Sequence, residues 1–191
     1  MSYFQKRENV NLYTDMMLDI DNSFVINEVE KVLPPNSTLL ELGMGTGLDL
    51  LSLSKKYRVL GSDYSQLFID DFKLKSDLDV CVLDAVSIDI DRKFDCIYSN
   101  KVLQHLATED LIVSLSNQFR HLNENGIIFL TLWNDNYREE FEFDGQLRFV
   151  YYDRATIEKL IPQELTIEKF ILYSEFESND SMIVILRAKL A

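Results

Sequence analysis

Three of the six glycines in this 191-residue chain fall within residues 41–47, which read ELGMGTG. An apolar run over residues 38–42 precedes this stretch, and residues 47–56 carry leucines at helical spacing after it. Glycine permits a tight turn and lets the backbone approach a ligand closely. Because the turn joins a predicted buried strand to a predicted helix, we expect a ligand to meet free backbone N–H groups at the start of that helix.

Strand-like and helical runs alternate after this point. We predict strands over residues 38–42, 58–61, 80–83, 94–98 and 126–133, and helices over 47–56, 65–75 and 108–122. Ser65 is the expected N-cap of the second of these helices. Strands that are joined through helices make right-handed crossovers and give a parallel sheet covered on both faces. The order of elements therefore predicts an α/β fold.

The two ends of the chain differ from this middle part. Residues 1–37 are expected to be helical, with one helix over 22–33 and a shorter one over 11–19. Residues 165–176 and 181–189 are strand-like runs joined by a short polar turn, which predicts an antiparallel pair. Within residues 139–151, an Asp144-Gly145 pair separates two alternating runs, and this pattern predicts a small hairpin that projects from the sheet.

Acidic residues close three successive predicted strands, at Glu41, Asp63 and Asp84. In open parallel sheets the carboxyl ends of the strands form the binding crevice, and a carboxylate at the end of the second strand can accept hydrogen bonds from ribose hydroxyls. Three carboxylates there disfavour a pyrophosphate. They favour a ligand that carries hydroxyls, amines or positive charge.

The spacing of the glycines separates two cofactor classes. A dinucleotide fingerprint, G-x-G-x-x-G/A, would place a small residue at position 48, where this chain has Leu48. The pattern G-x-G-x-G after an acid instead resembles the class I S-adenosylmethionine-dependent methyltransferases. Four further stretches resemble family motifs in the family's order, namely residues 59–65 (VLGSDYS), 83–85 (LDA), 94–100 (FDCIYSN) and 122–126 (LNENG).

The resemblance implies a fold, a domain layout and a cofactor site. The fold is a Rossmann-like, seven-stranded, mostly parallel sheet with an antiparallel C-terminal pair and helices on both faces. Residues 1–191 would be one domain, with an N-terminal segment at 1–37, a cofactor-binding half at 38–133 and a substrate side at 134–191. The cofactor would be S-adenosyl-L-methionine, bound at Glu41, Gly43, Gly45, Gly47, Asp63, Tyr64, Asp84, Ala85 and Ser99.

Each of these positions takes a role from the resemblance. Glu41 and Gly43 would hold the methionine amino group, and Asp63 would bind the ribose hydroxyls. The adenine would lie beside Tyr64, with its amino group donating to Asp84 and its ring facing the Ala85 N–H. Ser99 would offer its backbone carbonyl to the methionyl end.

Candidate residues for the chemistry are fewer. Methyl transfer is an in-line displacement for which a protein mainly aligns the reactants, and a general base is needed only when the acceptor must lose a proton. His105 follows the fourth strand and is a candidate base, against an equally weighted structural role. Trp133, Tyr137 and Tyr152 are candidates for an acceptor pocket, against ordinary packing. Aromatic residues of the N-terminal segment could form a lid over the cofactor: Tyr3, Phe4 and Tyr13.

Composition excludes several classes of partner. The formal net charge is −13, without a basic stripe, so nucleic acid is not an expected partner. No apolar run reaches the length of a membrane span, so the expected location is the cytoplasm. Cys81 and Cys96 lie in apolar runs and are expected to be buried free thiols, and no metal site is indicated.

The acceptor is inferred from what the sequence lacks. Residues 99–102, SNKV, lack the Asn/Asp-Pro-Pro-Tyr/Phe signature of enzymes that methylate planar amide or adenine nitrogens. The leading expectation is a small-molecule acceptor, with the hairpin as a lid. A protein methyltransferase and a non-catalytic cofactor-binding subunit are the alternatives, and a nicotinamide-dependent oxidoreductase is disfavoured by Leu48 and the acids. The oligomeric state stays open.

Overall fold

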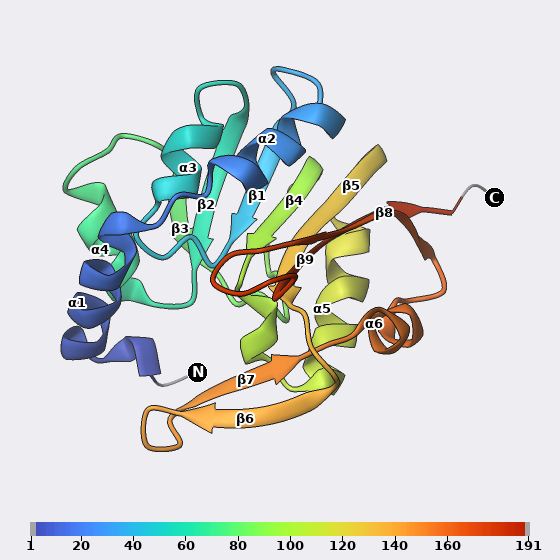
Figure 1. Ribbon diagram of the computed structural model, residues 1–191. Coiled ribbons are helices and arrows are strands. Elements are labelled where there is room, and N and C mark those ends of the chain that lie inside the picture. The colour runs from blue at the N-terminus through green and yellow to red at the C-terminus, as the bar shows by residue number, and fades with distance from the viewer. Residues whose placement is uncertain (1–2, 190–191) are drawn as a thin grey trace.

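A computed structural model describes residues 3–189 and contains one seven-stranded sheet, in the order β3-β2-β1-β4-β5-β9-β8 (Figure 1). Strands β1 to β5 are parallel, whereas β9 runs antiparallel to both β5 and β8. This is the predicted Rossmann-like sheet with its antiparallel C-terminal pair. The strands are Thr38–Leu42 (β1), Arg58–Asp63 (β2), Val80–Val82 (β3), Phe94–Asn100 (β4), Leu122–Trp133 (β5), Leu165–Tyr173 (β8) and Ser181–Ala188 (β9).

Helices cover both faces of this sheet because successive strand residues point to opposite sides. Leu39 packs in a buried cluster with Val29 of α2, whereas the next residue, Leu40, packs in another cluster with Leu111 of α5. Both faces are therefore apolar, as expected for parallel strands buried between helices. The helices are Ser23–Val32 (α2), Leu48–Leu53 (α3), Gln66–Lys73 (α4), Thr108–Arg120 (α5) and Arg154–Leu160 (α6), with a short 3-10 helix at Leu103–His105 (η3).

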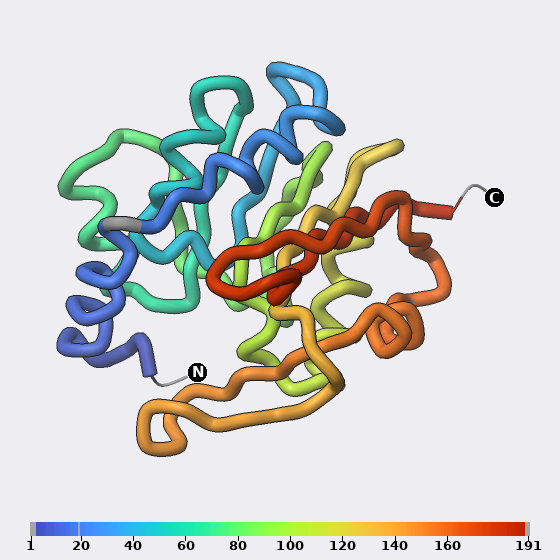
Figure 2. The backbone as a smooth tube through the Cα atoms, viewed as in Figure 1, coloured from blue at the N-terminus to red at the C-terminus, as the bar shows by residue number. Residues whose placement is uncertain are grey.

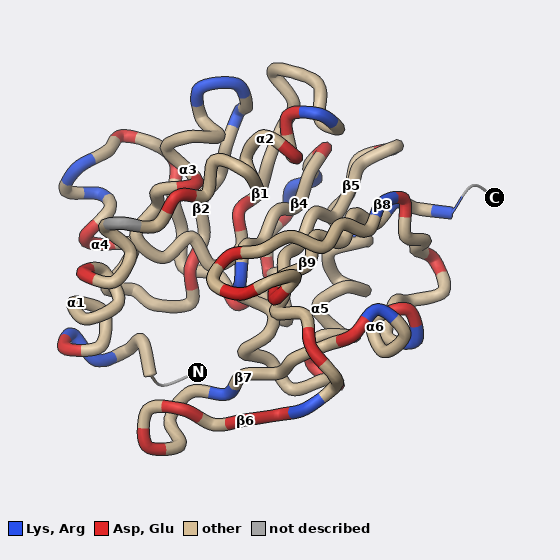
Figure 3. Tube along the Cα trace, viewed as in Figure 1, with Lys and Arg blue, Asp and Glu red and all other residues tan. Residues whose placement is uncertain are grey.

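The predicted hairpin is present and forms a sheet of its own, with strands Arg138–Glu142 (β6) and Leu147–Tyr151 (β7). Its turn holds Phe143, Asp144 and Gly145 at positive φ, with values of 52°, 55° and 78°. Figure 1 shows the hairpin below the end of the sheet at which β1 and β4 finish. Acidic residues lie along β6 and in the turn, as Figure 3 shows.

The N-terminal segment differs from the expectation in its first helix. The sequence pattern predicts a helix over residues 11–19, but α1 spans Arg7–Met16, between 3-10 turns at Tyr3–Gln5 (η1) and Met17–Asp19 (η2). Contacts with the rest of the chain explain the earlier start, because Val10 is fully buried and Arg7 forms an ion pair with Asp71 of α4. In the tube of Figure 2 the start of the chain comes close to the hairpin tip.

Ser65 takes the predicted N-cap position of α4 but does not cap the helix with its side chain. Its hydroxyl donates to the Phe4 carbonyl at 2.5 Å instead. A long-range contact therefore uses the group that the local pattern assigns to capping. Within residues 3–189, no helix is both long and apolar enough to cross a membrane.

Candidate active site

A cavity of about 600 Å³ lies at the carboxyl edge of the sheet. It runs from the end of β3, at Asp84, past the glycine turn to the end of β5, at Trp133. The N-terminal segment and the hairpin contribute the remaining walls, including Tyr13 and Phe149. Its size and position agree with the usual ligand sites of open α/β sheets.

The glycine turn depends on glycine at both of its ends. Gly43 has a φ of 69°, and a Cβ built there would lie 2.5 Å from Val102 Cγ1. Gly47 has a φ of 80°, and a Cβ there would overlap the ring of Phe72. The turn is thus fixed by backbone conformation and by close packing from behind, so its inner surface faces the cavity.

Asp63 holds the turn in this shape. Its Oδ2 accepts from the Gly45 N–H at 2.9 Å, and its Oδ1 accepts from the Ser65 N–H at 2.8 Å. Burial raises the pKa of Asp63, although these hydrogen bonds act in the opposite direction. The carboxylate lines the cavity and keeps lone pairs for further donors such as two hydroxyls.

Glu41 is a buried acid of the site whose hydrogen-bonding capacity is not satisfied. The residue is only 3% exposed, and its Oε2 is buried without a hydrogen-bond partner. Burial, together with the nearby Asp49 and Asp63, raises the pKa of Glu41 well above its usual range. An orphaned carboxylate oxygen on a cavity wall suits a cationic donor, so the site fits the amino group that the resemblance places there.

Aromatic residues of the N-terminal segment lie over this turn. A Cβ built on Gly45 would be 3.2 Å from Tyr13 Cε1, so the ring of Tyr13 sits directly against the glycine. Burial and the nearby acids Asp63, Asp49 and Glu41 raise the pKa of Tyr13. The rings of Phe4, Tyr13 and Phe68 pack against one another, with centroid distances of 5.4 Å from Phe4 to Tyr13 and 5.6 Å from Phe68 to each of the other two.

The end of the cavity beside β2 and β3 contains the residues expected around an adenine. Tyr64, Asp84 and Ala85 all line it, and Tyr64 is 46% exposed. Asp84 Oδ1 accepts from the Val86 N–H at 2.7 Å, which fixes the carboxylate at the strand end. Gly47 and Ser99 lie behind the lining, and Ser99 is buried with its hydroxyl oxygen unpartnered.

His105 lines the cavity and lies in η3, which packs against β7. Its Nδ1 is 2.7 Å from the Arg148 carbonyl, and its ring packs edge-on against Phe149 at 4.6 Å. A carbonyl only accepts, so Nδ1 carries the hydrogen and the neutral ring keeps a lone pair on Nε2. Burial lowers the pKa of His105 to about 4, although the Arg148 carbonyl opposes the shift.

The three aromatic candidates for an acceptor pocket do not come together. Trp133 lines the cavity, whereas Tyr137 and Tyr152 lie outside its lining. Tyr152 is fully buried, and its ring lies 5.9 Å from that of Tyr137. Tyr137 is half exposed, with its hydroxyl 3.2 Å from Thr108 Oγ1. These two tyrosines pack where the chain leaves the sheet for the hairpin.

Several cavity residues are not predicted by the sequence pattern. Asp49 accepts from the Tyr98 hydroxyl at 2.7 Å and from Asn100 Nδ2 at 2.9 Å. Lys101 and Glu175 form an ion pair of 3.1 Å on the cavity wall. Lys101 directly follows β4, and that position is a usable signal. The position of Glu175 depends on the β8–β9 connection, for which the sequence holds no comparable signal.

The described residues contain no group of three or more His, Cys, Asp or Glu side chains arranged to hold a metal ion. Cys81 and Cys96 are free thiols, as expected. Cys96 is fully buried, whereas Cys81, also expected to be buried, is only partly buried. The polar groups of the cavity lining in this part of the chain are carboxylates, amides, hydroxyls, backbone groups, one histidine and the basic side chains of Lys101 and Arg148. Such a set binds and orients an organic ligand.

Sequence comparison matches residues 39–126 to a family model described as a methyltransferase domain. The matched stretch contains the glycine turn and the acids at the ends of β1, β2 and β3. A comparison with curated proteins found no match.

Solved structures share the whole fold. An S-adenosylmethionine-dependent methyltransferase from Clostridium acetobutylicum is 18% identical with a TM-score of 0.73, over 93% of this chain and 98% of the other. A 1,6-didemethyltoxoflavin-N1-methyltransferase from Burkholderia thailandensis is 15% identical with a TM-score of 0.77, over 98% and 84%. The glycopeptide N-methyltransferase MtfA, in complex with S-adenosylmethionine, is 14% identical with a TM-score of 0.73, over 90% and 96%.

Proposed function

We propose that this chain is a class I S-adenosylmethionine-dependent methyltransferase, as its match to a methyltransferase-domain model over residues 39–126 and its fold support, and that it methylates a small molecule held under the β6–β7 hairpin. The closure of the cavity carries the proposal. The N-terminal segment and the hairpin tip meet over it, where the rings of Tyr3 and Phe143 lie 4.9 Å apart. A macromolecule would have to separate these elements, whereas a small acceptor fits beneath them.

The cofactor is proposed to lie along the carboxyl edge from β3 to β4. Its adenine would lie between Tyr64 and Asp84, with the amino group donating to the Asp84 carboxylate and the ring facing the Ala85 N–H. The ribose hydroxyls would donate to Asp63, which already accepts from the turn.

The methionyl end would then reach β1 and β4. The amino group would donate to the orphaned Glu41 oxygen beside Gly43, and to the backbone carbonyl of Ser99. This order leaves the part of the cavity over β4 and β5 for the acceptor.

Bound S-adenosylmethionine supplies a methyl group on a positively charged sulfur, so the protein's task is mainly to align the acceptor with it. The candidate for taking a proton from the acceptor is His105 Nε2. The Arg148 carbonyl fixes the tautomer, because it occupies the Nδ1 hydrogen. The unprotonated Nε2 can therefore accept from an N–H or O–H of the acceptor and hold it in line.

A labelling experiment tests the proposal. The protein is incubated with a cell extract and S-adenosylmethionine that carries a labelled methyl group, and the extract is then dialysed. We expect label in a dialysable product that chromatography separates from S-adenosylmethionine, and no such product with Asp63→Ala. Label retained by macromolecules would support a protein methyltransferase instead. Absence of any labelled product despite calorimetric binding of the cofactor would support a non-catalytic cofactor-binding subunit.

The named activities of two structural neighbours are compatible with this proposal. One is a 1,6-didemethyltoxoflavin-N1-methyltransferase and the other a glycopeptide N-methyltransferase, so both methylate nitrogen by name. The charge of the cavity argues independently against an anionic acceptor. Two basic side chains line the cavity, Lys101 and Arg148. Six carboxylates line it as well, namely Glu41, Asp49, Asp63, Asp84, Asp110 and Glu175.

A further inference from the structure

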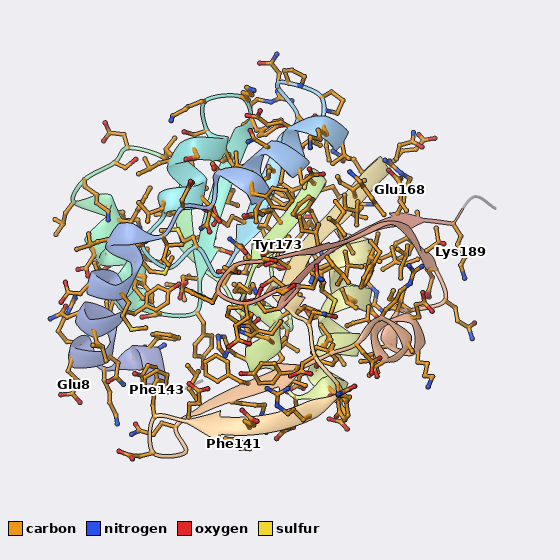
Figure 4. The ribbon with its side chains drawn as sticks, in the orientation of Figure 1. Glu8, Phe141, Phe143, Glu168, Tyr173 and Lys189 are labelled. Atoms are coloured by element: carbon orange, nitrogen blue, oxygen red, sulfur yellow. The ribbon has the colours of Figure 1, made fainter. Side chains whose placement is uncertain are left out.

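The ammonium group of Lys101 occupies a site built from an aromatic face, a carboxylate and a hydroxyl. Its Nζ lies 3.1 Å from the centre of the Trp133 ring and 3.1 Å from Glu175 Oε2, and it donates to Ser181 Oγ at 2.7 Å. The centre of the Tyr173 ring lies 5.7 Å from the same Nζ. The side chain of Lys101 is only 14% exposed. Figure 4 marks Tyr173 on β8, where this strand leads into the β8–β9 connection.

These contacts use the whole hydrogen-bonding capacity of the ammonium. An ammonium has three N–H donors, and here they face an oxygen of Glu175, an oxygen of Ser181 and the π face of Trp133. In this position Lys101 has no donor left for a ligand. The surroundings, in contrast, are complementary to any alkylammonium of similar shape.

The carboxylate of this site is held in place by its own loop. Asp180 accepts backbone N–H groups from Glu175, Phe176 and Glu177, each at 2.8 Å. Glu175 Oε2 also lies 3.4 Å from the Tyr173 hydroxyl and 3.2 Å from the Ser181 hydroxyl. Because the Glu175 carboxylate is already held in position, the free energy needed to reorganise it is small when one cation replaces another.

The site opens onto the cavity rather than into the core. Lys101, Trp133, Glu175 and Phe176 all belong to the cavity lining, and Phe176 is 69% exposed with its ring 5.9 Å from that of Trp133. Lys101 follows Asn100 at the end of β4, which is where the proposed cofactor position leaves room for the acceptor. Burial also lowers the pKa of Lys101 to about 8, so the free energy that holds its charge in this site is reduced.

We propose that this end of the cavity binds an amine of the methyl acceptor, which displaces the Lys101 ammonium from its place between Trp133 and Glu175. The flexible stem of the lysine lets its charge move into the open cavity. Aromatic faces with a nearby carboxylate bind alkylammonium groups, so the site suits the amine in its charged form. This ammonium anchors the acceptor and is not itself the nucleophile, because its nitrogen has no lone pair. The inference depends on the proposed function only in identifying the molecule that carries the amine as the methyl acceptor.

Trp133 reports on this site directly, because it is the only tryptophan of the chain. We would titrate cofactor-free wild-type protein, Lys101→Ala and Lys101→Ala/Glu175→Gln with n-butylammonium, which copies the lysine side chain, and follow the Trp133 fluorescence. The uncharged 1-butanol serves as the matched probe, at constant chloride. Lys55→Ala removes an exposed lysine in the turn before β2, outside the cavity lining, and serves as the control variant.

We expect Lys101→Ala to bind n-butylammonium at least tenfold more tightly than 1-butanol, and the double variant to lose this preference. Wild type and Lys55→Ala should bind n-butylammonium saturably but more weakly, because Lys101 competes. No preference for the cation in Lys101→Ala would overturn the proposal, as would a wild-type protein that n-butylammonium never saturates.

Thermal unfolding checks that each variant is folded, and Lys101→Met replaces Lys101→Ala if the latter is not. None of these measurements requires S-adenosylmethionine. A failure of the proposed function would instead appear as absent cofactor binding in calorimetry, with the amine titrations unchanged.

Discussion

Tyr3 and Phe143 pack ring against ring, with centroids 4.9 Å apart, and so join the start of the chain to the tip of the hairpin. A hydrogen bond of 2.7 Å from Lys6 Nζ to Gln146 Oε1 supports the same contact. Figure 4 labels Phe143 on the hairpin turn, which faces the N-terminal segment. Because both rings line the cavity, opening this contact opens the cavity.

Phe143→Ala should therefore loosen the two elements that close the cavity, the N-terminal segment and the β6–β7 hairpin. Removing the ring leaves the exposed Lys6–Gln146 hydrogen bond alone, and such surface contacts contribute on the order of 1 kcal/mol or less. We expect faster hydrogen exchange in residues 3–10 and a several-fold lower kcat/KM for the acceptor, with cofactor affinity changed by less than the turnover. Phe141→Ala is the control, because this exposed ring points elsewhere on β6 and does not line the cavity.

If the hairpin is a lid, deletion of residues 139–151 should impair turnover far more than it impairs cofactor affinity. Equal losses of turnover and affinity would show that the hairpin supports the cofactor site itself and would contradict the lid. Single-turnover kinetics together with calorimetry separate these two cases.

Asp63→Ala should abolish tight binding of S-adenosylmethionine. The variant loses two hydrogen bonds that shape the glycine turn and the acceptor atoms proposed for the ribose. Hydrogen bonds to charged groups contribute about 1.5–3 kcal/mol each, so we expect the dissociation constant measured by calorimetry to be at least 100-fold larger than that of wild type. Asp70→Ala, an exposed acid on α4, should bind like wild type. Wild-type affinity in Asp63→Ala would exclude the assigned role.

Glu41→Gln should weaken cofactor binding while it stabilises the free protein. Burial raises the pKa of Glu41, so the folded protein holds this proton more tightly than the unfolded chain does. Between the ordinary and the raised pKa the folded state binds more protons, and stability falls as pH rises. Glutamine removes this penalty, so we expect a higher free energy of unfolding for Glu41→Gln than for wild type at about pH 8, measured by urea unfolding.

Binding of the cofactor should also release a proton from Glu41. A cationic amino group beside the carboxylate favours its ionised form, so the proton leaves on binding. Calorimetry in buffers of different ionisation enthalpy should detect this release in wild type and a smaller release in Glu41→Gln. An equal release in both proteins would assign the proton to another group.

His105→Asn separates two roles of the histidine. The asparagine amide can still donate to the Arg148 carbonyl, but it offers nothing in place of Nε2. We expect about 10²-fold loss of kcat, the lower end of the range for a general base, with unchanged thermal stability. His105→Ala loses the hydrogen bond as well and should also be less stable. If His105→Asn keeps full activity, the residue is an anchor for β7 only.

The low pKa of His105, about 4, predicts how stability depends on pH. The unfolded chain binds a proton at His105 near pH 6.5, whereas the folded protein does so only near pH 4. Between these values the unfolded state binds more protons, so stability is lost as pH falls through this window. We expect a loss of roughly 2–3 kcal/mol from this residue in wild type and a smaller one in His105→Asn.

The sequence alone determined the sheet and the floor of the site. Strand and helix patterns have short periods, and glycines, strand ends and acids are local features. These local features suffice to place Glu41, Asp63 and Asp84 on one edge of the sheet. The hairpin was equally visible, because its turn residues lie within its own sequence.

Only the tertiary structure determined which segments close the cavity and which side chains line its proposed acceptor end. The Tyr3–Phe143 contact, the position of Tyr13 over Gly45 and the Lys101–Glu175 pair all join segments that are distant in sequence. Periodicity indicates that a residue is buried but not which distant segment buries it. For the same reason Trp133 reached the cavity, whereas Tyr137 and Tyr152 packed outside its lining. Long-range packing selects these partners, since many apolar contacts of similar free energy are compatible with the same local pattern.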